Sequence, residues 1–321
     1  MERRNAEPML IDGMTADLGG PRTSALLDDL ARSIPWEKLA RPVRTLYKND
    51  EKGGAPAWPA VMMLRCVMLA KWFNLSDPQL EENLKDRLSF RRFAGLSLTD
   101  KTPDQTTFVV FCRRLREAKM DRTLFDAVAK HLDQMGLLVK EGTLVDATII
   151  EQAKGKKRED GTHTRDEEAT FTKKHGRTYH GYKGHIAADR SEIVIDYRFS
   201  TASHHDSRYI DEMTTKEKQV VYGDSAYSSR ERRERLRKRG VVDGICYKKN
   251  RGQKELYPYQ EKWNTMVSKV RALVEHPFAR LKQHMGLRRV RYRGLRRNEL
   301  DFALNLIAHN LRRALSLTKM A

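Results

Sequence analysis

The sequence predicts an all-α region followed by an α/β region in which helices pack on a mixed sheet. Up to about residue 140, apolar residues recur at helical spacing between proline and capping signals. From Gly142 onward, short β-rich runs alternate with helical stretches in the order β-β-β-α-β-α-β-α-α. This change of pattern predicts a boundary between two domains near residue 140.

The helices of the first region are expected to follow a polar, disordered tail over residues 1–20. Pro35 is expected to interrupt the first of these helices. Ser76 and Pro78 are typical of a helix start, because they provide a capping side chain and a proline in the first turn. The expected helices cover residues 24–40, 60–73, 79–88, 105–118 and 122–135.

The second region is expected to begin with a strand over residues 143–150. The polar and charged stretch 153–179 is expected to form a loop. The further expected elements are strands over residues 182–188, 193–199, 219–222 and 241–247, a short helix near Ser207, and helices over residues 228–239, 261–285 and 295–315.

The composition favours a protein that binds a polyanion. The chain has 321 residues, of which 39% are hydrophobic and 33% charged, and its net charge is +19. Nucleic acid is the partner that this charge favours most, with acidic proteins and anionic lipid as alternatives. Mean hydropathy is −0.70, and the most apolar run, 61–73, contains Arg65 and Lys71, so we expect no membrane span. We expect a cytoplasmic protein, because the N-terminus also lacks the apolar stretch of a signal peptide.

Two aspartates stand where a carboxylate needs a partner or a ligand. Asp146 lies inside the apolar run 144–150, where a buried and unpaired carboxylate is costly. Asp224 follows the apolar run 220–222 after a single glycine. The carboxyl end of a strand is the position at which open α/β sheets place ligand-binding groups.

A third acid, Glu275, lies in the first of the two helical stretches near the C-terminus. At about 100° per residue, Arg271 and Lys282 fall within about 40° of Glu275 on a regular helix. One face would therefore carry an acid between two cations. Pro277 is expected to kink this helix, which makes the shared face approximate.

We hypothesise that Asp146, Asp224 and Glu275 converge on Mg²⁺, which prefers oxygen ligands. Two such ions about 3.5–4 Å apart can activate an attacking oxygen and stabilise a leaving oxygen in phosphoryl transfer. Each acid by itself also fits a strand-end turn or a surface ion pair. The separations along the chain, 78 and 51 residues, do not decide between these interpretations.

Several motifs, in this order along the chain, resemble bacterial insertion-sequence transposases of the DDE type, and most closely the IS-five branch of the IS-four group. In the first region the similar motifs are those at residues 75–93 and 103–108. In the second region they are residues 144–150 (LVDATII), 180–185 (HGYKGH), 221–227 (VYGDSAY) and 274–282 (VEHPFARLK).

The resemblance implies a ribonuclease-H-like catalytic domain with basic C-terminal helices over residues 141–321, after a helical DNA-binding and dimerisation domain over residues 21–140. It assigns catalysis and metal binding to the three acids above, with Mg²⁺ as the ion and Mn²⁺ as a substitute. Arg271 and Lys282 match the family's signature around the last acid, whereas Ser268 stands at its tyrosine position. The resemblance also implies a homodimer and a bacterial, nucleoid-associated protein.

Further basic residues are expected to contact DNA. Lys183 and His185 would share one face of their strand, opposite His180 and Tyr182, and one of these pairs would meet phosphates near the metal ions. The alternative for both pairs is a polar strand end. The basic residues of the helix over residues 228–239 are explained equally well by DNA contacts and by a helix face exposed to solvent. The run 280–297 holds eight basic residues and no acid, which favours phosphate contacts. The contacts expected within this run are Arg288, Arg289, Arg291 and Arg293.

Taken with the resemblance, these observations predict a transposase that binds the ends of its element, cleaves them and joins the freed 3′ ends to target DNA. Two alternatives remain open. The first is a DNA-binding protein derived from a transposase that no longer catalyses, and the second is a metal-dependent DNA nuclease without strand transfer.

Overall fold

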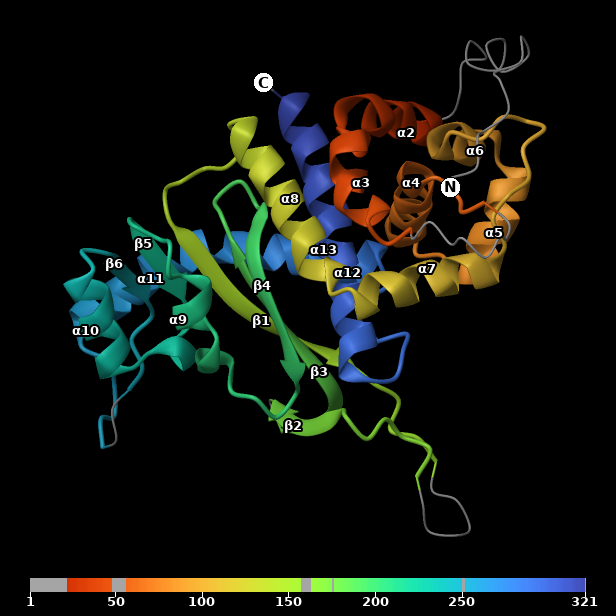
Figure 1. Ribbon diagram of the computed structural model, residues 1–321. Coiled ribbons are helices and arrows are strands. Elements are labelled where there is room, and N and C mark those ends of the chain that lie inside the picture. The colour runs from red at the N-terminus through yellow and green to blue at the C-terminus, as the bar shows by residue number, and fades with distance from the viewer. Residues whose placement is uncertain (1–21, 48–55, 157–162, 175, 250–251, 321) are drawn as a thin grey trace. The chain divides into compact units, whose positions relative to one another are not determined.

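The structure is a computed structural model that describes residues 22–47, 56–156, 163–174, 176–249 and 252–320 (Figure 1). The tail expected over residues 1–20 lies outside the described residues. The chain divides into two compact units, Met1–Val128 with Ala303–Ala321, and Ala129–Phe302. Both divisions fall inside helices, α8 (Met120–Gln134) and α13 (Leu295–Thr318).

The first unit is built around one buried helix, α4 (Ala60–Trp72). Its sequence, AVMMLRCVMLAKW, presents apolar side chains on every face, so it can be packed on all sides. Trp72 donates a hydrogen bond of 2.8 Å from Nε1 to the Ala308 carbonyl. The other helices before the sheet are α2 (Arg22–Ser33), α3 (Trp36–Arg44), α5 (Asp77–Asp86), α6 (Leu88–Ala94) and α7 (Gln105–Glu117).

The helix ends of this unit follow the expected signals. The break predicted at Pro35 is confirmed, since α2 ends before it and α3 begins after it. α5 opens with a capping box in which the Ser76 N–H donates to Gln79 Oε1 at 2.9 Å and the Gln79 N–H donates back to Ser76 Oγ. The sequence does not predict α6 as a separate helix. Arg87, in an extended conformation, separates it from α5.

The second unit contains a six-stranded mixed sheet in the order β2-β3-β1-β5-β6, with β4 paired to β3. β1 runs antiparallel to β3 and parallel to β5. β2 pairs with the first part of β3, and β4 with the second part. The strands are β1 (Thr143–Glu151), β2 (Thr170–Lys174), β3 (Arg177–Ala188), β4 (Val194–Thr201), β5 (Val220–Gly223) and β6 (Val242–Ile245).

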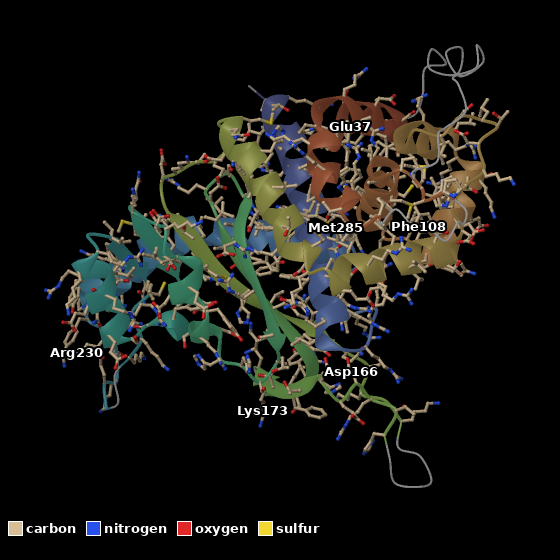
Figure 2. The ribbon with its side chains drawn as sticks, viewed as in Figure 1. Glu37, Phe108, Asp166, Lys173, Arg230 and Met285 are labelled. Atoms are coloured by element: carbon tan, nitrogen blue, oxygen red, sulfur yellow. The ribbon has the colours of Figure 1, made fainter. Side chains whose placement is uncertain are left out.

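The loop predicted over residues 153–179 is wrong at its C-terminal end. This stretch contains β2 and the start of β3, which pair as a hairpin from Lys174↔Arg177 outward. Lys173 and Lys174 make this strand difficult to predict, because charged residues are typical of loops. They are exposed, as charged side chains at a hairpin end are expected to be (Lys173 is labelled in Figure 2).

One face of the sheet packs against two helices that connect its later strands, α9 between β4 and β5 and α10 between β5 and β6. Val145 of β1 belongs to a buried cluster with Ile210 and Leu236, which come from α9 and α10. Figure 1 shows α10 beside β6 and α9 beside β5. The helical elements on this side are the short turns η1 (Asp206–Arg208) and η2 (Ser225–Tyr227) and the helices α9 (Ile210–Met213) and α10 (Arg230–Lys238).

The opposite face of β3 packs against the start of α13. The Phe302 ring lies 5.3 Å from the Phe199 ring and close to Gly184, where an added Cβ would come within 2.5 Å of it. Gly184 is therefore required by close packing. No helix among the described residues is both long and apolar enough to cross a membrane.

The helix predicted over residues 261–285 is split, as Pro277 indicates. α11 (Pro258–Arg271) and α12 (Glu275–His284) are separated by one 3-10 turn, η3 (Ala272–Val274). Pro277 has no N–H to donate to the carbonyl four residues earlier, so regular helical bonding cannot run through this turn. The break makes Glu275 the first residue of α12.

We predict that Gly184→Ala lowers the free energy of unfolding by about 1–3 kcal/mol, because the new methyl group overpacks against Phe302. Urea denaturation of Gly184→Ala, of Phe302→Leu and of the variant that combines them checks this. Phe302→Leu is expected to relieve part of the cost of Gly184→Ala, which gives a favourable coupling energy in the double-mutant cycle. Strict additivity of the two changes would contradict the packing explanation.

Candidate active site

The register of two parallel strands brings Asp146 and Asp224 together. β1 and β5 pair as Thr143↔Val221 and Leu144↔Tyr222. This offset is 78 residues, the same number that separates Asp146 from Asp224. Each aspartate thus stands two residues beyond the last pair, Asp146 within β1 and Asp224 directly after the carboxyl end of the neighbouring strand β5. The two carboxylates interact electrostatically, and the charge of Asp224 contributes to raising the pKa of Asp146.

Asp146 is the more perturbed of the two aspartates. Its side chain is only 20% exposed, and burial, the largest cause, raises its pKa to about 6. The Ala147 N–H, which donates to Oδ1 at 2.8 Å, and the Arg271 guanidinium act in the opposite direction. A carboxylate at this position is therefore stabilised by any cation that reaches it.

Arg271 links the first and third acids. Its guanidinium lies 3.6 Å from Asp146 Oδ2 and 3.4 Å from Glu275 Oε1. Arg271 is the last residue of α11 and Glu275 the first of α12, so η3 sets the distance between them. Glu275 is 61% exposed. Two of the three acids predicted from the sequence therefore lie beside one arginine, and the third, Asp224, interacts electrostatically with Asp146.

The carboxylates of this group are candidate ligands for a divalent metal ion. Among the described residues, no three His, Cys, Asp or Glu side chains are close enough together to hold one metal ion. Arg271 lies between two of the acids, in the place where a cation offsets their charge. The donor set nevertheless fits a hard divalent ion, because it consists of carboxylate oxygens and includes one aspartate within β1 and one directly after the adjacent strand β5.

Two lysines add positive charge around Asp146. Lys282 of α12 and Lys174 of β2 both interact electrostatically with this carboxylate and with each other. Burial is the main reason that the pKa of Lys282 is lowered, and Lys174 is the next. Sequence reasoning selected Lys282 but missed Lys174, because the strand that carries Lys174 was expected to be loop. The β-forming triplet at residues 170–172 (TFT) is the signal that could have found it.

Tyr227 is a second residue near the acids that sequence reasoning missed. It is fully buried in the cluster under the sheet. Burial, followed by the charge of Asp146, raises its pKa well above the usual value. Its ring also lies against Gly223, where an added Cβ would come within 3.2 Å of it. Tyr227 thus supports the turn that carries Asp224.

The DNA contacts expected at Lys183 and His185 are not supported, because both side chains are buried. Lys183 forms an ion pair of 2.8 Å with Asp206 and donates to the His204 carbonyl at 2.8 Å. His185 Nε2 lies 3.0 Å from Ser200 Oγ. These groups join β3 to β4 and to the segment after β4.

The other residues of this motif are equally internal. The Tyr182 hydroxyl donates to Asp166 at 2.7 Å, and His180 Nε2 lies 3.2 Å from the Ala169 carbonyl. Gly181 has a φ of +155° and passes close to the Ile150 carbonyl. The motif HGYKGH therefore describes a tightly packed strand.

The basic run 288–293 lies beside the end of β1. The Glu151 N–H donates to the Arg288 carbonyl at 3.0 Å, and the Val290 N–H donates to the Glu151 carbonyl at 2.9 Å. Asp166, labelled in Figure 2, accepts from the Gly294 N–H at 2.8 Å and fixes the end of the run. The four arginines expected to contact DNA, all of them exposed, are Arg288, Arg289, Arg291 and Arg293.

The basic helix α10 differs from this run. Arg232 and Arg235 pair with Asp211, and Arg233 pairs with Asp243. Much of the positive charge of α10 is thus used to hold neighbouring elements in place. Arg230, at the start of the helix, is exposed and lies on its outer side (Figure 2).

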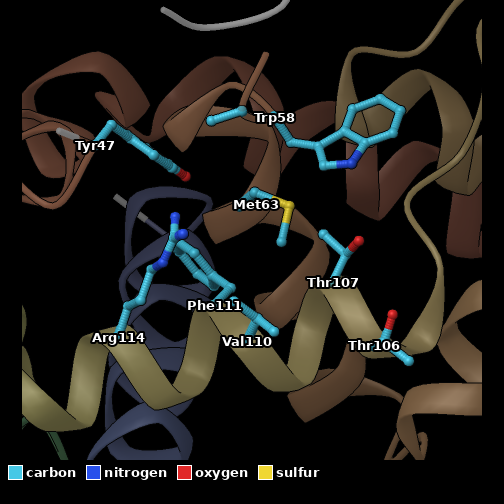
Figure 3. A pocket seen from close by; sticks show the side chains of 9 residues that line it. Tyr47, Trp58, Met63, Thr106, Thr107, Val110, Phe111 and Arg114 are labelled. Atoms are coloured by element: carbon cyan, nitrogen blue, oxygen red, sulfur yellow. The ribbon is translucent and has the colours of Figure 1, made fainter. Parts of the chain in front are cut away.

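The first unit contains a separate pocket with aromatic walls (Figure 3). Arg114 is the charged residue in its lining, so the pocket offers no acid for catalysis or metal binding. The residues around it are Tyr47, Ala57, Trp58, Met63, Thr106, Thr107, Val110, Phe111 and Arg114.

We predict that stability decreases as the pH falls from about 6.5 to about 4, in part because of His185. Burial lowers its pKa to about 4, so the unfolded chain takes up a proton that folded His185 does not. This contribution is fully present above the unfolded pKa and is reduced by up to about 3 kcal/mol as the pH falls. Guanidinium unfolding across this pH range is expected to show a smaller pH dependence for His185→Gln. An unchanged dependence would contradict the assignment, and exposed His284→Gln is the control.

Comparison with known proteins places the chain in a family. The family described as Transposase DDE domain matches residues 138–311, and the one described as Transposase domain (DUF772) matches residues 20–114.

Two solved structures show weaker similarity. The piggyBac transposase synaptic complex with hairpin DNA has a TM-score of 0.47 at 10% identity, over 92% of this chain and 75% of that one. A pre-cleavage Mos1 transpososome has a TM-score of 0.20 at 11% identity, over 86% and 84%. The DDE match, in contrast, covers more than half of the residues, and the chain belongs to the family of transposases with a DDE domain.

Proposed function

We propose that this chain is a DNA transposase that cleaves DNA at the ends of its element and joins the freed 3′ ends to target DNA. The observation that supports this most directly is the β1–β5 register, which aligns Asp146 with Asp224. Arg271, between Asp146 and Glu275, brings the third acid into the same group. We assign the sheet and helices of the second unit to a ribonuclease-H-like catalytic domain.

In this proposal Asp146, Asp224 and Glu275 hold Mg²⁺, with Mn²⁺ as a substitute. When bound, the metal ions supply the charge that activates the attacking oxygen and stabilises the leaving oxygen. Arg271, Lys282 and Lys174 neutralise and position the phosphates of the cleaved strand. Positioning and charge neutralisation are the main contributions that a protein makes to phosphoryl transfer.

Two in-line displacements make up the reaction. In the first, a water oxygen bonds to phosphorus as the P–O3′ bond breaks, which leaves a 3′-hydroxyl and a 5′-phosphate. In the second, that 3′-hydroxyl attacks a phosphodiester of target DNA, and its oxygen replaces the target strand's own 3′ oxygen. One P–O bond forms for each one broken in the second step, so no nucleotide cofactor is needed.

We propose that the helices of the first unit bind the element ends and form the contacts of a homodimer. The match of residues 20–114 to a transposase domain supports this assignment. α7 offers exposed Arg113 and Arg114 for phosphates. The IS-five branch and a bacterial, nucleoid-associated protein complete the proposal and rest on the sequence motifs.

We predict that Asp146→Asn, Asp224→Asn and Glu275→Gln each lower DNA cleavage by about 100-fold or more, because each removes a carboxylate charge that would hold the metal ions. DNA affinity is expected to stay within about twofold, since phosphate contacts by the basic run dominate binding. The assay is cleavage of a supercoiled plasmid carrying the presumed ends, in Mg²⁺ and in EDTA. Glu234→Gln, an exposed acid on α10, is the matched control.

The products of this assay separate the alternatives. Strands joined to target DNA support a transposase, whereas cut ends that are never joined indicate a nuclease. Tight binding with no cutting in Mg²⁺ or Mn²⁺ would leave only the DNA-binding alternative. Cleavage that persists in all three acid variants would overturn the site.

We also predict that the basic run dominates the salt dependence of DNA binding. Removing one phosphate interaction lowers the slope of log affinity against log salt concentration by about 0.9, so replacing all four exposed arginines of 288–293 with alanine is expected to lower it by about 3–4. Fluorescence anisotropy with duplex DNA at several salt concentrations measures this slope. The control replaces exposed Arg230 and Arg237 of α10. A larger change of slope in the control than in the four-arginine variant would indicate that α10 forms the DNA-binding surface.

A further inference from the structure

A strip of exposed aromatic side chains lies at the start of α11, apart from the acid site. Tyr257 and Tyr259 are 58% and 61% exposed. Their rings are stacked, with centroids 5.9 Å apart and only 7° between the planes. Tyr247 meets Tyr259 edge-on at 6.1 Å. Tyr257 and Tyr259 therefore form an aromatic surface open to solvent, and half-buried Tyr247 extends it.

This surface is held in place by the protein beneath it. The Tyr247 N–H donates to Asn264 Oδ1 at 2.7 Å, and Asn264 Nδ2 donates back to the Tyr247 carbonyl at 3.1 Å. The Arg233 guanidinium lies over the Tyr247 ring, 4.2 Å from its centroid. The Tyr257 N–H donates to Gln260 at 3.1 Å. The rings are thus pre-positioned, and little ordering is needed when a ligand binds.

Basic side chains continue the strip along α11. Tyr259, Lys262, Met266 and Lys269 are all exposed, and their spacing of three, four and three residues places them within an arc of about 80° on the helix. Glu261 falls about 160° away from Tyr259, outside that arc. Three more exposed lysines precede α11, namely Lys248, Lys249 and Lys254.

Aromatic faces flanked by cations suit single-stranded nucleic acid. Unpaired bases stack on exposed rings while lysines contact the phosphates. Duplex DNA does not fit this surface as well, because its bases are stacked on one another and offer no free face. α11 is about 20 Å long, which matches about six nucleotides at about 3.4 Å per residue of a strand. The helix ends at Arg271, which contacts two of the acids.

We propose that this tyrosine–lysine strip binds single-stranded DNA, with bases stacked on Tyr257 and Tyr259 and phosphates on Lys262 and Lys269. It is a site separate from the three acids. The choice of DNA as the nucleic acid rests on the proposed function. Binding at the strip requires no metal ion and no cleavage, so the two proposals can fail independently.

The test is fluorescence anisotropy of the full chain in EDTA with a labelled oligothymidylate of about 12 nucleotides, within the range of single-strand site sizes. The Tyr257→Ala, Tyr259→Ala double variant is expected to bind about 100-fold more weakly, at about tenfold for each ring. The matched Tyr257→Phe, Tyr259→Phe variant keeps the aromatic faces and is expected to bind within about twofold of wild type. An abasic strand of equal length is expected to bind weakly to wild type, and with the same affinity to the alanine variant.

The lysines are tested in the same assay. Lys262→Ala with Lys269→Ala is expected to lower the salt slope for the single strand by about 1.4, at about 0.7 for each phosphate contact. Lys238→Ala, on α10 and paired with Glu234, is the control and is expected to leave the slope unchanged.

Three results would overturn the inference. One is oligothymidylate binding by the alanine variant that equals wild type, at unchanged thermal stability. Another is equal affinity of wild type for abasic and thymidylate strands. The third is a change of oligomeric state in the alanine variant by light scattering, which would assign the strip to a contact between copies. If the wild-type protein binds the single strand but does not cleave the plasmid, the proposed function is rejected and the single-strand site is retained.

Discussion

The candidate site depends on the in-register pairing of two parallel strands. β1 and β5 share two residue pairs, and two residues beyond the last pair stand Asp146, within β1, and Asp224, directly after β5. A slip of one residue would point one of the two side chains to the opposite face of the sheet. The register is fixed by burial, because Val145 and Val221 belong to the same core cluster on one face. The hydrophobic core therefore also sets the separation of the two carboxylates.

The third acid reaches the same place by a different constraint. Pro277 prevents a regular helix from running through residues 272–274, and the resulting 3-10 turn puts Arg271 and Glu275 at the adjoining ends of two helices. Without this break, both residues would still share a helix face. With it, Arg271 ends α11 at Asp146 while Glu275 begins α12. The break at Pro277 thus places Glu275 beside the arginine that contacts Asp146 of β1.

The parts of the structure that were predictable from sequence are those with a local cause. The capping box at Ser76, the break at Pro35 and the kink before Pro277 each follow from one residue acting on its own backbone. The strand β2 was not predictable in this way, because Lys173 and Lys174 give it the composition of a loop. Pairing with β3, which lies across the hairpin, stabilises it as a strand.

The candidate site shows the same division between local and non-local causes. Asp146 and Asp224 stand out because carboxylates are unusual in apolar strands, but only the register reveals that their separation of 78 residues equals the strand offset. Lys183 and His185 stand out equally as charged and titratable residues of a strand, yet they are buried. Charge and alternation alone do not distinguish a side chain that faces a ligand from one that faces Asp206.

The positive charge of this chain consequently has two uses. Lys183, Arg232 and Arg233 have acidic partners inside the protein, and removing either member of a buried pair leaves an uncompensated charge. Their positive charge adds to the net charge of +19 but is not available to a polyanion. The exposed arginines of 288–293 and the lysines of α11 lie on the surface of the second unit. Net charge therefore indicates the class of partner, whereas the exposure of each basic side chain indicates where that partner can bind.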